Sequence, residues 1–423
     1  MNRRVRSVRA SACVILVVAL STSACGGGDD SDSASPSGTT APSKPCPGDP
    51  IKLTSIAALT SSLGDRTEIG KMGVNAAVNA TNRECLLGRP LEVKFCDDKG
   101  DPNANVACGR EAASDGSLAI FGSIGTFDDG VTASGLPAIF VNGTSPFELT
   151  DENAYSSVNG LAIGISAASA LRARGNETSV LLLPDSPTFQ FAGNLIVELA
   201  AMLDIEVDSI FYAQDTTDFA PIAAQVSEKD DDSLGMLPVN PVVIVNALAQ
   251  EGVTPEDQDI VVPGGVITRD ILEQLGDAAN GMLLVSSAMP PSATENEGIQ
   301  EFRADMEADG KDPDDPLVDA ATVTSWSNVK KLVGALLAAG PEVIASLDSQ
   351  KVVDAVVDHP IDRPETAPYD FREHQIPEVE ELAGFRMFTR KIAVLQIEDG
   401  EYNVLSDGFI DILEPPDLSS DGS

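Results

Sequence analysis

Short strand-like segments alternate with longer amphipathic segments along most of the chain, and this alternation restricts the fold more than any other feature. Strand-like runs occur at residues 51–59, 91–96, 118–121, 138–141, 179–183, 207–213, 259–262 and 282–286. Segments with helical spacing lie between them, at residues 69–80, 161–174, 190–202, 219–228 and 239–251. The alternation predicts an α/β fold of doubly wound parallel sheets with helices on both faces. Because the pattern starts again near residue 160, we expect two lobes.

The last third of the sequence is mostly helical in pattern. Helices are expected at residues 299–309, 319–339 and 351–358. The second contains the single tryptophan, Trp326, which we interpret as a core residue, with stacking on a ligand as the alternative.

Residues 359–386 are rich in proline and charge, and predict an extended surface loop. Strands at 392–397 and 402–405 flank a Glu-Asp-Gly turn, which predicts a hairpin. From Glu414 onward the composition predicts a disordered tail.

The charge and residue composition exclude several classes of function. Acidic residues number 66 and basic residues 27, so the formal net charge is −39. A chain this acidic lacks the basic face that binds nucleic acid or an anionic membrane surface. His359 and His374 are the only histidines, so histidine-based catalysis and histidine-rich metal sites are not expected. Aromatic residues make up 4% of the chain, so the core must consist mainly of alanine, valine, isoleucine and leucine.

The first 24 residues read as a bacterial targeting segment. Four arginines precede an apolar run at residues 13–20, which is too short to span a bilayer. Small residues then lead to Cys25, an arrangement that resembles a lipobox, in which the cysteine receives the lipid; an ordinary secretory signal is the alternative. Residues 25–48 are rich in Gly, Ser, Asp, Thr and Pro, and predict a flexible tether. We therefore expect a lipid-anchored protein on the outer face of the bacterial cytoplasmic membrane.

Four cysteines remain after Cys13 and Cys25, and an even number outside the cytoplasm favours two disulfides. Cys96 ends an expected strand and Cys108 lies two turns into the next helix, so we predict a Cys96–Cys108 bond. Cys46 then pairs with Cys85. Zinc is the rival interpretation, but the chain has no CxxC pair and its histidines are far away in sequence.

Motifs that would indicate an enzyme are incomplete. Residues 64–71 (GDRTEIGK) resemble a phosphate loop, but the spacing is one residue too long, and Met72 stands where a hydroxyl must meet magnesium. No GxSxG elbow accompanies the histidines. The acidic runs lack the ligand spacing of a calcium loop. We expect no enzymatic activity, no cofactor and no metal.

Several segments in order resemble the leucine/isoleucine/valine-binding family of ABC-transporter solute-binding proteins, over roughly residues 49–407. They are IKLTSIAALTSSLG (51–64), LGRPLEVKFCDDKGDPNANVACGR (87–110), IFGSIGT (120–126), TSPFELT (144–150), TTDFAPIAAQV (216–226) and LGDAANGMLLVSSAMPP (275–291). The resemblance implies the type I periplasmic-binding fold, with two α/β lobes joined by three crossovers. Lobe 1 would comprise residues 49–158 and 287–390, and lobe 2 residues 159–286 and 391–413, with a tail at 414–423.

The same resemblance implies a ligand site between the lobes, at the carboxyl ends of the strands. The matching positions are Thr60, Ser61, Ser62, Ser123, Thr126, Thr144, Ser145, Asp185, Phe189 and Gly264. Amino-acid binders of the family carry a glutamate near the position of Gly264, where this chain has no acid. The alternative is that Asp185, the one nearby acid, substitutes for it and restores an amino-acid site. We therefore expect a ligand without a free ammonium, such as an amide or a carboxylic acid.

The resemblance implies a monomeric lipoprotein that captures a small molecule and delivers it to an ABC permease. Two alternatives share the fold: a receptor-like sensor that does not transport, and a degenerate surface lipoprotein with an inactive cleft.

Overall fold

The computed structural model describes residues 46–60, 64–122, 127–142, 146–158, 160–213, 215–229, 231–238, 240–375 and 384–418. These residues belong to one compact unit, Lys44–Ser423. The targeting segment, Cys25 and most of the tether lie outside the described residues. Within the described residues, no helix has both the length and the apolar character needed to cross a bilayer.

The first lobe is built on a five-stranded parallel sheet. Its strands are β1 (Ile51–Ala57), β2 (Leu91–Asp97), β3 (Ile120–Phe121), β4 (Ala138–Val141) and β5 (Ala154–Ser156). Their order in the sheet is β2-β1-β3-β4-β5. In register, Ile51 lies opposite Leu91, and Thr54 lies opposite Ile120. Strand β1 is therefore central, which agrees with the burial of nearly all its residues.

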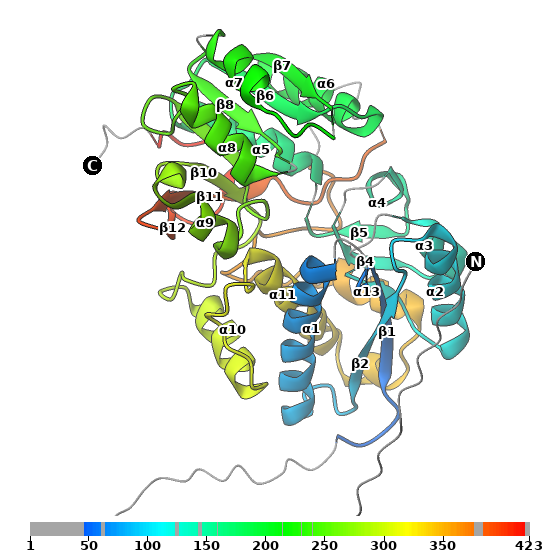
Figure 1. The fold of residues 1–423 in the computed structure, drawn as a ribbon. Helices are drawn as coiled ribbons and strands as arrows, with labels where there is room; N and C mark the ends of the chain where they lie inside the picture. The colour runs from blue at the N-terminus through cyan, green and yellow to red at the C-terminus, as the bar shows by residue number, and fades with distance from the viewer. Residues whose placement is uncertain are drawn as a thin grey trace, which may run out of the picture. The chain divides into compact units, whose positions relative to one another are not determined.

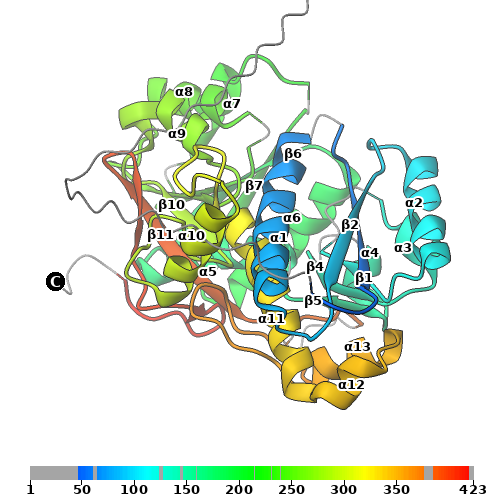
Figure 2. The ribbon, with the colours of Figure 1, turned by 90° about the horizontal axis from the view of Figure 1, so that it is seen from below.

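Helices cover both faces of this sheet, as Figures 1 and 2 show. One side carries α1 (Gly64–Glu84), α10 (Glu297–Ala308), α11 (Ala320–Ala339), α12 (Pro341–Ala345) and α13 (Ser349–Asp358). The other carries α2 (Pro102–Asp115) and α3 (Asp129–Ser134), and α4 (Pro146–Thr150) precedes β5. Alternate residues of β1 serve the two sides: Leu53 packs with α1, whereas Ile56 packs with α2 and α3. This period of two is what a doubly wound sheet requires.

Close backbone approach joins helices α1 and α11. A Cβ atom on Gly73 would lie 2.3 Å from the carbonyl oxygen of Thr322. Only a glycine permits that contact, so Gly73 sets how closely the two helices pack. The start of α2 is set by its own sequence, because Asp101 is its N-cap, Pro102 its first residue, and the Asp101 carboxylate accepts from two backbone N–H groups.

The second lobe contains the larger, mixed sheet. Its parallel strands are β6 (Thr178–Pro184), β7 (Glu206–Tyr212), β8 (Ser233–Met236), β9 (Asp259–Pro263) and β10 (Leu283–Ser286). The antiparallel strands are β11 (Lys391–Glu398), β12 (Glu401–Val404) and the short β13 (Ile410–Asp411). The sheet order is β12-β11-β10-β9-β8-β6-β7, with β13 paired to β11. Strands β11 and β12 form the hairpin expected from the Glu-Asp-Gly turn.

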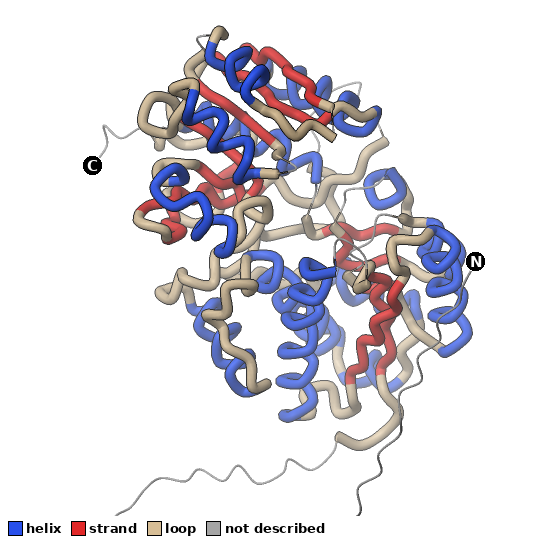
Figure 3. Tube along the Cα trace, in the orientation of Figure 1, coloured by secondary structure: helices blue, strands red, loops and turns tan. Residues whose placement is uncertain are grey.

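Two helical layers cover this second sheet as well (Figure 3). Helices α5 (Gly160–Ala173) and α6 (Pro187–Ala201) share a core with Val261, Leu283 and Val285. Helices α7 (Ala220–Ser227), α8 (Pro241–Gln250) and α9 (Arg269–Leu275), with the 3-10 turn η1 (Gly276–Ala279), share the other core with residues such as Ile260 and Leu284. Both lobes are therefore doubly wound, as predicted.

The chain passes between the lobes three times: after β5, after β10, and before β11. Two segments at these passages pair with each other. The Met289 N–H donates to the carbonyl of Glu365, and the Ala367 N–H donates to the carbonyl of Ser287. The fold class predicted from the sequence, two α/β lobes joined by three crossovers, is confirmed. The residue limits assigned to each lobe stay a prediction.

Two local expectations need correction, one strand was not expected, and one expectation is confirmed. Residues 359–386 are not simply a surface loop, because Glu365, Tyr369 and Phe371 are buried. The chain from Glu414 is not wholly disordered, since the Leu418 N–H donates to the carbonyl of Ala173. Strand β8, which lacks a clear apolar pattern, was not expected. Trp326 is buried as predicted, and its Nε1–H donates to Asp305.

Both predicted disulfides are present. Cys46 bonds to Cys85 with a Cα–Cα distance of 5.3 Å, and Cys96 bonds to Cys108 with a Cα–Cα distance of 5.7 Å. The first ties the beginning of the described chain to the segment after α1. The second fastens β2 to α2.

Candidate ligand-binding cleft

A cavity of about 320 Å³ lies between the two lobes. From the first lobe it is lined by residues that follow β3, β4 and β5: Gly122, Asn142 and Val158. From the second lobe it is lined by residues at the ends of β9 and β10: Pro263, Gly264, Gly265, Val285, Ser286 and Ser287. The cavity therefore sits at the carboxyl ends of parallel strands from both sheets, where doubly wound folds bind ligands.

Most side chains around this cavity are apolar. Phe95 comes from β2, Ile69 and Val74 from the first half of α1, and Phe140 from β4. The start of α11 completes the wall, because Asp319 caps that helix and also lines the cavity. Its carboxylate accepts from the backbone N–H groups of Ala321 and Thr322, at 2.9 and 3.1 Å. These hydrogen bonds hold the first turn of α11 in place beside the cavity.

A bulge in β4 positions Phe140. Ile139 pairs with Tyr155 and Val141 pairs with Ser156, so Phe140 is an extra residue with no partner in β5. Its φ of +55° is rare for an aromatic residue and strains the backbone. The ring packs against Phe121, Tyr369 and Phe371, with ring centroids 5.5 to 6.1 Å apart. The ring itself is fully buried, so Phe140 makes this part of the cavity wall rigid without offering exposed apolar surface.

Asn328 is the most deeply buried polar side chain in the lining. It lies on α11 and is 4% exposed. Its Oδ1 accepts from Ser157 Oγ at 3.1 Å, and its Nδ2 lies 3.5 Å from the carbonyl oxygen of Phe140. Ser286 is also polar and buried, but its hydroxyl already bonds to the backbone of Ala288. Asn328 thus has hydrogen-bonding capacity that the protein uses only in part.

The structure places the described members of the predicted site differently. Gly264 lines the cavity. Thr60 does not, and its hydroxyl donates to Asp97 at 2.6 Å. Burial tends to raise the pKa of Asp97, but hydrogen bonds from Thr60 and Lys99 hold it below its ordinary value. Ser61, Ser62, Ser123, Thr126, Thr144 and Ser145 lie outside the described residues.

Asp185 and Phe189 are also outside the cavity lining. Asp185 is exposed, and its carboxylate accepts from the Gln190 side chain at 2.5 Å. Phe189 lies in the first turn of α6, where its N–H donates to the N-cap Ser186. Sequence reasoning missed Asp319 and Asn328, which belong to a helix far along the chain from β1–β5. No local pattern marks them as cavity residues, because α11 carries several other polar side chains, such as Thr324 and Lys330.

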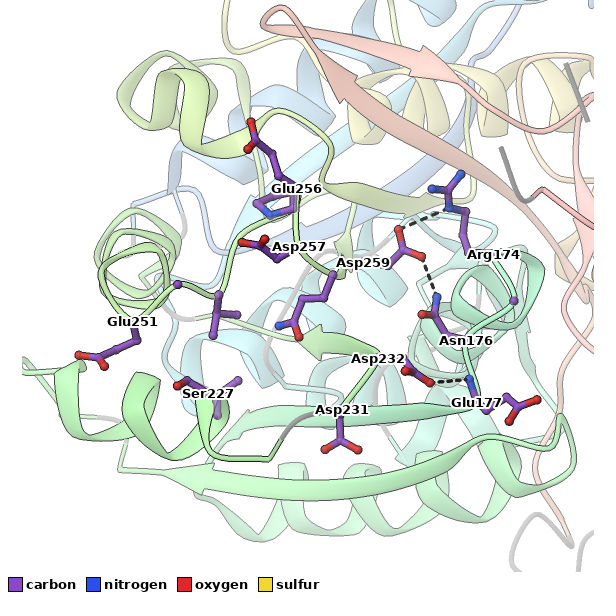
Figure 4. Close-up of a pocket in the computed structure, with 16 residues that line it drawn as sticks. Arg174, Asn176, Glu177, Ser227, Asp231, Asp232, Glu251, Glu256, Asp257 and Asp259 are labelled. Carbon is purple, nitrogen blue, oxygen red and sulfur yellow. Dashed lines mark hydrogen bonds and ion pairs between the residues drawn. The ribbon is translucent and has the colours of Figure 1, made fainter. Parts of the chain in front are cut away.

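A second cavity, of about 820 Å³, lies at the opposite end of the second lobe (Figure 4). It is formed largely by segments that precede β6, β8 and β9, and seven of its sixteen lining residues are acidic. Asp259 forms an ion pair with Arg174 at 3.4 Å and accepts from Asn176 at 2.7 Å. Burial raises the pKa of Asp231 in the same wall. Among the described residues, no group of His, Cys, Asp or Glu has an arrangement that could hold a metal ion.

The sequence profile of the family described as "Periplasmic binding protein" matches residues 50–400. The chain belongs to the periplasmic binding protein family. The resemblance to leucine/isoleucine/valine-binding proteins, first drawn from short segments, is thereby confirmed. A search of curated protein sequences found no match.

Solved structures share the fold of this family member at low sequence identity. An ABC transporter substrate-binding protein from Sphaerobacter thermophilus has a TM-score of 0.68 and 17% identity, over 87% of this chain and 100% of that one. A leucine binding protein from Thermotoga maritima has a TM-score of 0.62 and 16% identity, over 85% and 99%. A solute binding protein from R. palustris, solved with 4-hydroxybenzoate, has a TM-score of 0.66 and 18% identity, over 87% and 98%.

Proposed function

We propose that this protein is an extracytoplasmic solute-binding lipoprotein that captures a small molecule between its lobes and delivers it to an ABC permease. The observation that carries the proposal is the cavity at the carboxyl ends of both sheets, in a chain matched to the family over residues 50–400. Binding needs only shape and hydrogen-bonding groups, and the lining supplies both.

The apolar lining supports a solute with an apolar body and few polar groups. Phe95 and Val158 offer apolar surface, while backbone groups near Gly264 and the amide of Asn328 offer hydrogen bonds. An amino acid, an amide or a small carboxylate fits this description. The titles of the neighbours support the same range, since one names leucine binding and another a complex with 4-hydroxybenzoate.

A thermal-shift screen over amino acids, amides and aromatic acids tests solute binding. A solute that binds only the folded state raises the melting temperature, by an amount that grows with its concentration. Small-angle scattering should then show a smaller radius of gyration, because two lobes joined by three crossovers can close on the solute. If no compound in a broad panel raises the melting temperature, the proposal of a working binding protein is wrong.

The proposed lipid anchor has its own test. Cys25→Ser should release the protein from the membrane fraction without changing its melting temperature, because the tether separates Cys25 from the folded unit. A Cys25→Ser protein that stays with the membrane after signal cleavage would contradict lipid attachment at this residue.

A further inference from the structure

We propose that Asn328 recognises a hydrogen-bond acceptor oxygen on the solute, and that this oxygen is carried on a ring-sized apolar body packed against the apolar lining of the cavity. The inference deepens the proposed function and rests on it, since it concerns which chemistry the cleft selects. It assigns the polar contact to helix α11, a part of the chain that the resemblance to known binding proteins did not point to.

The hydrogen bonds of Asn328 leave donor capacity at the cavity. Its Oδ1 is used by Ser157 Oγ, which donates to it at 3.1 Å. A primary amide has two N–H donors, and its Nδ2 has one long contact, 3.5 Å from the carbonyl oxygen of Phe140. In the part of the chain that the structure describes, the second N–H of this amide has no acceptor.

Burial makes that unused donor unfavourable when an apolar solute fills the cleft. The side chain is only 4% exposed, so water reaches it poorly when the cleft holds an apolar solute. A buried donor without a partner is unfavourable, and a solute oxygen that accepts from Nδ2 removes this cost. A solute of the same shape without the oxygen cannot, so the amide discriminates between the two.

The fixed orientation of Asn328 gives the contact its direction. Ser157 holds the oxygen of the amide, which leaves the Nδ2 side as the donor. Ser157 directly follows β5, at the first passage between the lobes. Asn328 lies on a long helix whose position is fixed by the close contact between Gly73 and Thr322. Both partners therefore belong to well-packed parts of the first lobe.

The apolar lining defines the body that the oxygen must be attached to. The ring of Phe140 is fully buried, but this residue lines the cavity and its carbonyl oxygen lies 3.5 Å from Asn328 Nδ2. Phe95 and Val158, which are half-buried, give the same cavity accessible apolar surface. The donor and the apolar surface therefore line one cavity. An aromatic ring or a comparable branched group, bearing one carbonyl or carboxylate oxygen, satisfies both features at once.

The test uses three probes that separate the two features: benzamide carries both the ring and the oxygen, toluene only the ring, and acetamide only the oxygen. Calorimetry on the full-length protein should show benzamide binding at least tenfold tighter than either of the others. Asn328→Leu, which keeps the approximate volume but removes the donor, should bring benzamide to within threefold of toluene. Asn328→Asp, which keeps the acceptor for Ser157, should also weaken benzamide at least tenfold.

Asn403→Leu is the matched control, because Asn403 is an exposed residue of β12 outside the cavity. It should bind all three probes as the unaltered protein does. A merely structural role for Asn328 would weaken benzamide and toluene equally, and that result would overturn the proposal.

Unchanged benzamide binding in both Asn328 variants would overturn it as well, although solute binding itself would stand. If benzamide does not bind the unaltered protein at millimolar concentration, the assigned solute class is wrong. The wider thermal-shift panel then decides separately whether the cleft binds any solute.

Discussion

Two cavities in the described part of the chain differ in size and in lining, and the smaller one has the features of a ligand site. The larger one, about 820 Å³, is formed by segments that precede strands of the second lobe and is walled by carboxylates. The smaller one, about 320 Å³, collects residues that follow strands of both lobes and is largely apolar. Apolar surface and a few fixed polar groups are what hold a small solute. The position of a cavity relative to the strand ends therefore identifies the candidate site, whereas the volume of the cavity does not.

The walls of the two cavities also differ in construction. The cleft is bounded by α11, which packs on α1 at Gly73, and by Phe140, which is fixed by three aromatic neighbours. The acidic cavity is bounded by turns and loop segments, whose charged side chains are mostly exposed. Substitutions near the cleft should therefore change stability and binding far more than substitutions in the acidic cavity.

Gly73→Ala should have the largest effect. The new Cβ would lie 2.3 Å from the carbonyl oxygen of Thr322, and a backbone atom cannot yield as a flexible side chain does. Helices α1 and α11 must separate, which we expect to lower the free energy of unfolding by about 3 kcal/mol and to weaken solute binding. Urea unfolding at equilibrium measures the loss.

Gly235→Ala provides the control for the same chemical change. Its Cβ would meet its nearest atom, Leu181 Cδ1, at 3.6 Å, which is an ordinary contact. We expect this variant to be unchanged or up to about 1 kcal/mol more stable, because alanine restricts the unfolded chain. Equal losses in Gly73→Ala and Gly235→Ala would contradict the special role given to the contact between α1 and α11.

Lys331→Met should stabilise the protein at neutral pH. Lys331 lies on α11 with its ammonium 4.8 Å from the centre of the Tyr369 ring, and burial lowers its pKa to about 8. The unfolded chain keeps its proton up to the ordinary value of 10.5, so keeping the buried amine charged below pH 8 costs about 3 kcal/mol. The lost ring contact and the bond to Ala367 offset part of this, and we expect a net gain of about 1–2 kcal/mol.

The pH dependence gives the sharper test of that substitution. Between pH 8 and pH 10.5 the unfolded chain binds more protons at Lys331 than the folded protein does, so stability rises with pH across this window. Below pH 8 both states are protonated and this slope disappears. Lys331→Met should lack the rise, and denaturant melts at pH 7 and pH 10 would show it. A variant with the same pH slope as the unaltered protein would show that Lys331 is not its source.

Glu256→Gln should have the smallest effect. Its side chain belongs to the wall of the acidic cavity, and no ion pair within the described residues holds it. We expect the free energy of unfolding to change by less than about 0.5 kcal/mol, and solute affinity to stay the same. Calorimetry with the best solute from the screen checks the second expectation. A tenfold loss of affinity in Glu256→Gln would move the candidate site to the acidic cavity.

Much of the fold could be predicted from local patterns, because the residues within most strands and helices have the spacing and end signals typical of those elements. The Asp101-Pro102 pair marks the start of α2, and the Glu-Asp-Gly turn marks the hairpin. Residues 359–386 are more buried than their composition predicts, and the reason is physical. Their charge predicts exposure, yet Glu365 is fully buried because Arg363 pairs with it at 2.6 Å.

The candidate site was less predictable than the fold. Gly264 could be predicted because it follows a strand directly, and such positions meet at the sheet edge. Asn328 lies in the middle of a helix, where a polar residue gives no sign of facing a cavity. Its role depends on Ser157, which is 171 residues away in sequence. Phe140 depends on a bulge that only the pairing of β4 with β5 reveals.

Hydrogen–deuterium exchange with and without a saturating solute tests the central claim most directly, because it reports on both cavities in one measurement. Capture at the carboxyl ends predicts slower exchange in residues 263–267, 285–288 and 319–325, with no change in residues 174–177 and 251–259. Protection confined to residues 174–177 and 251–259, with the cleft segments unaffected, would contradict the account.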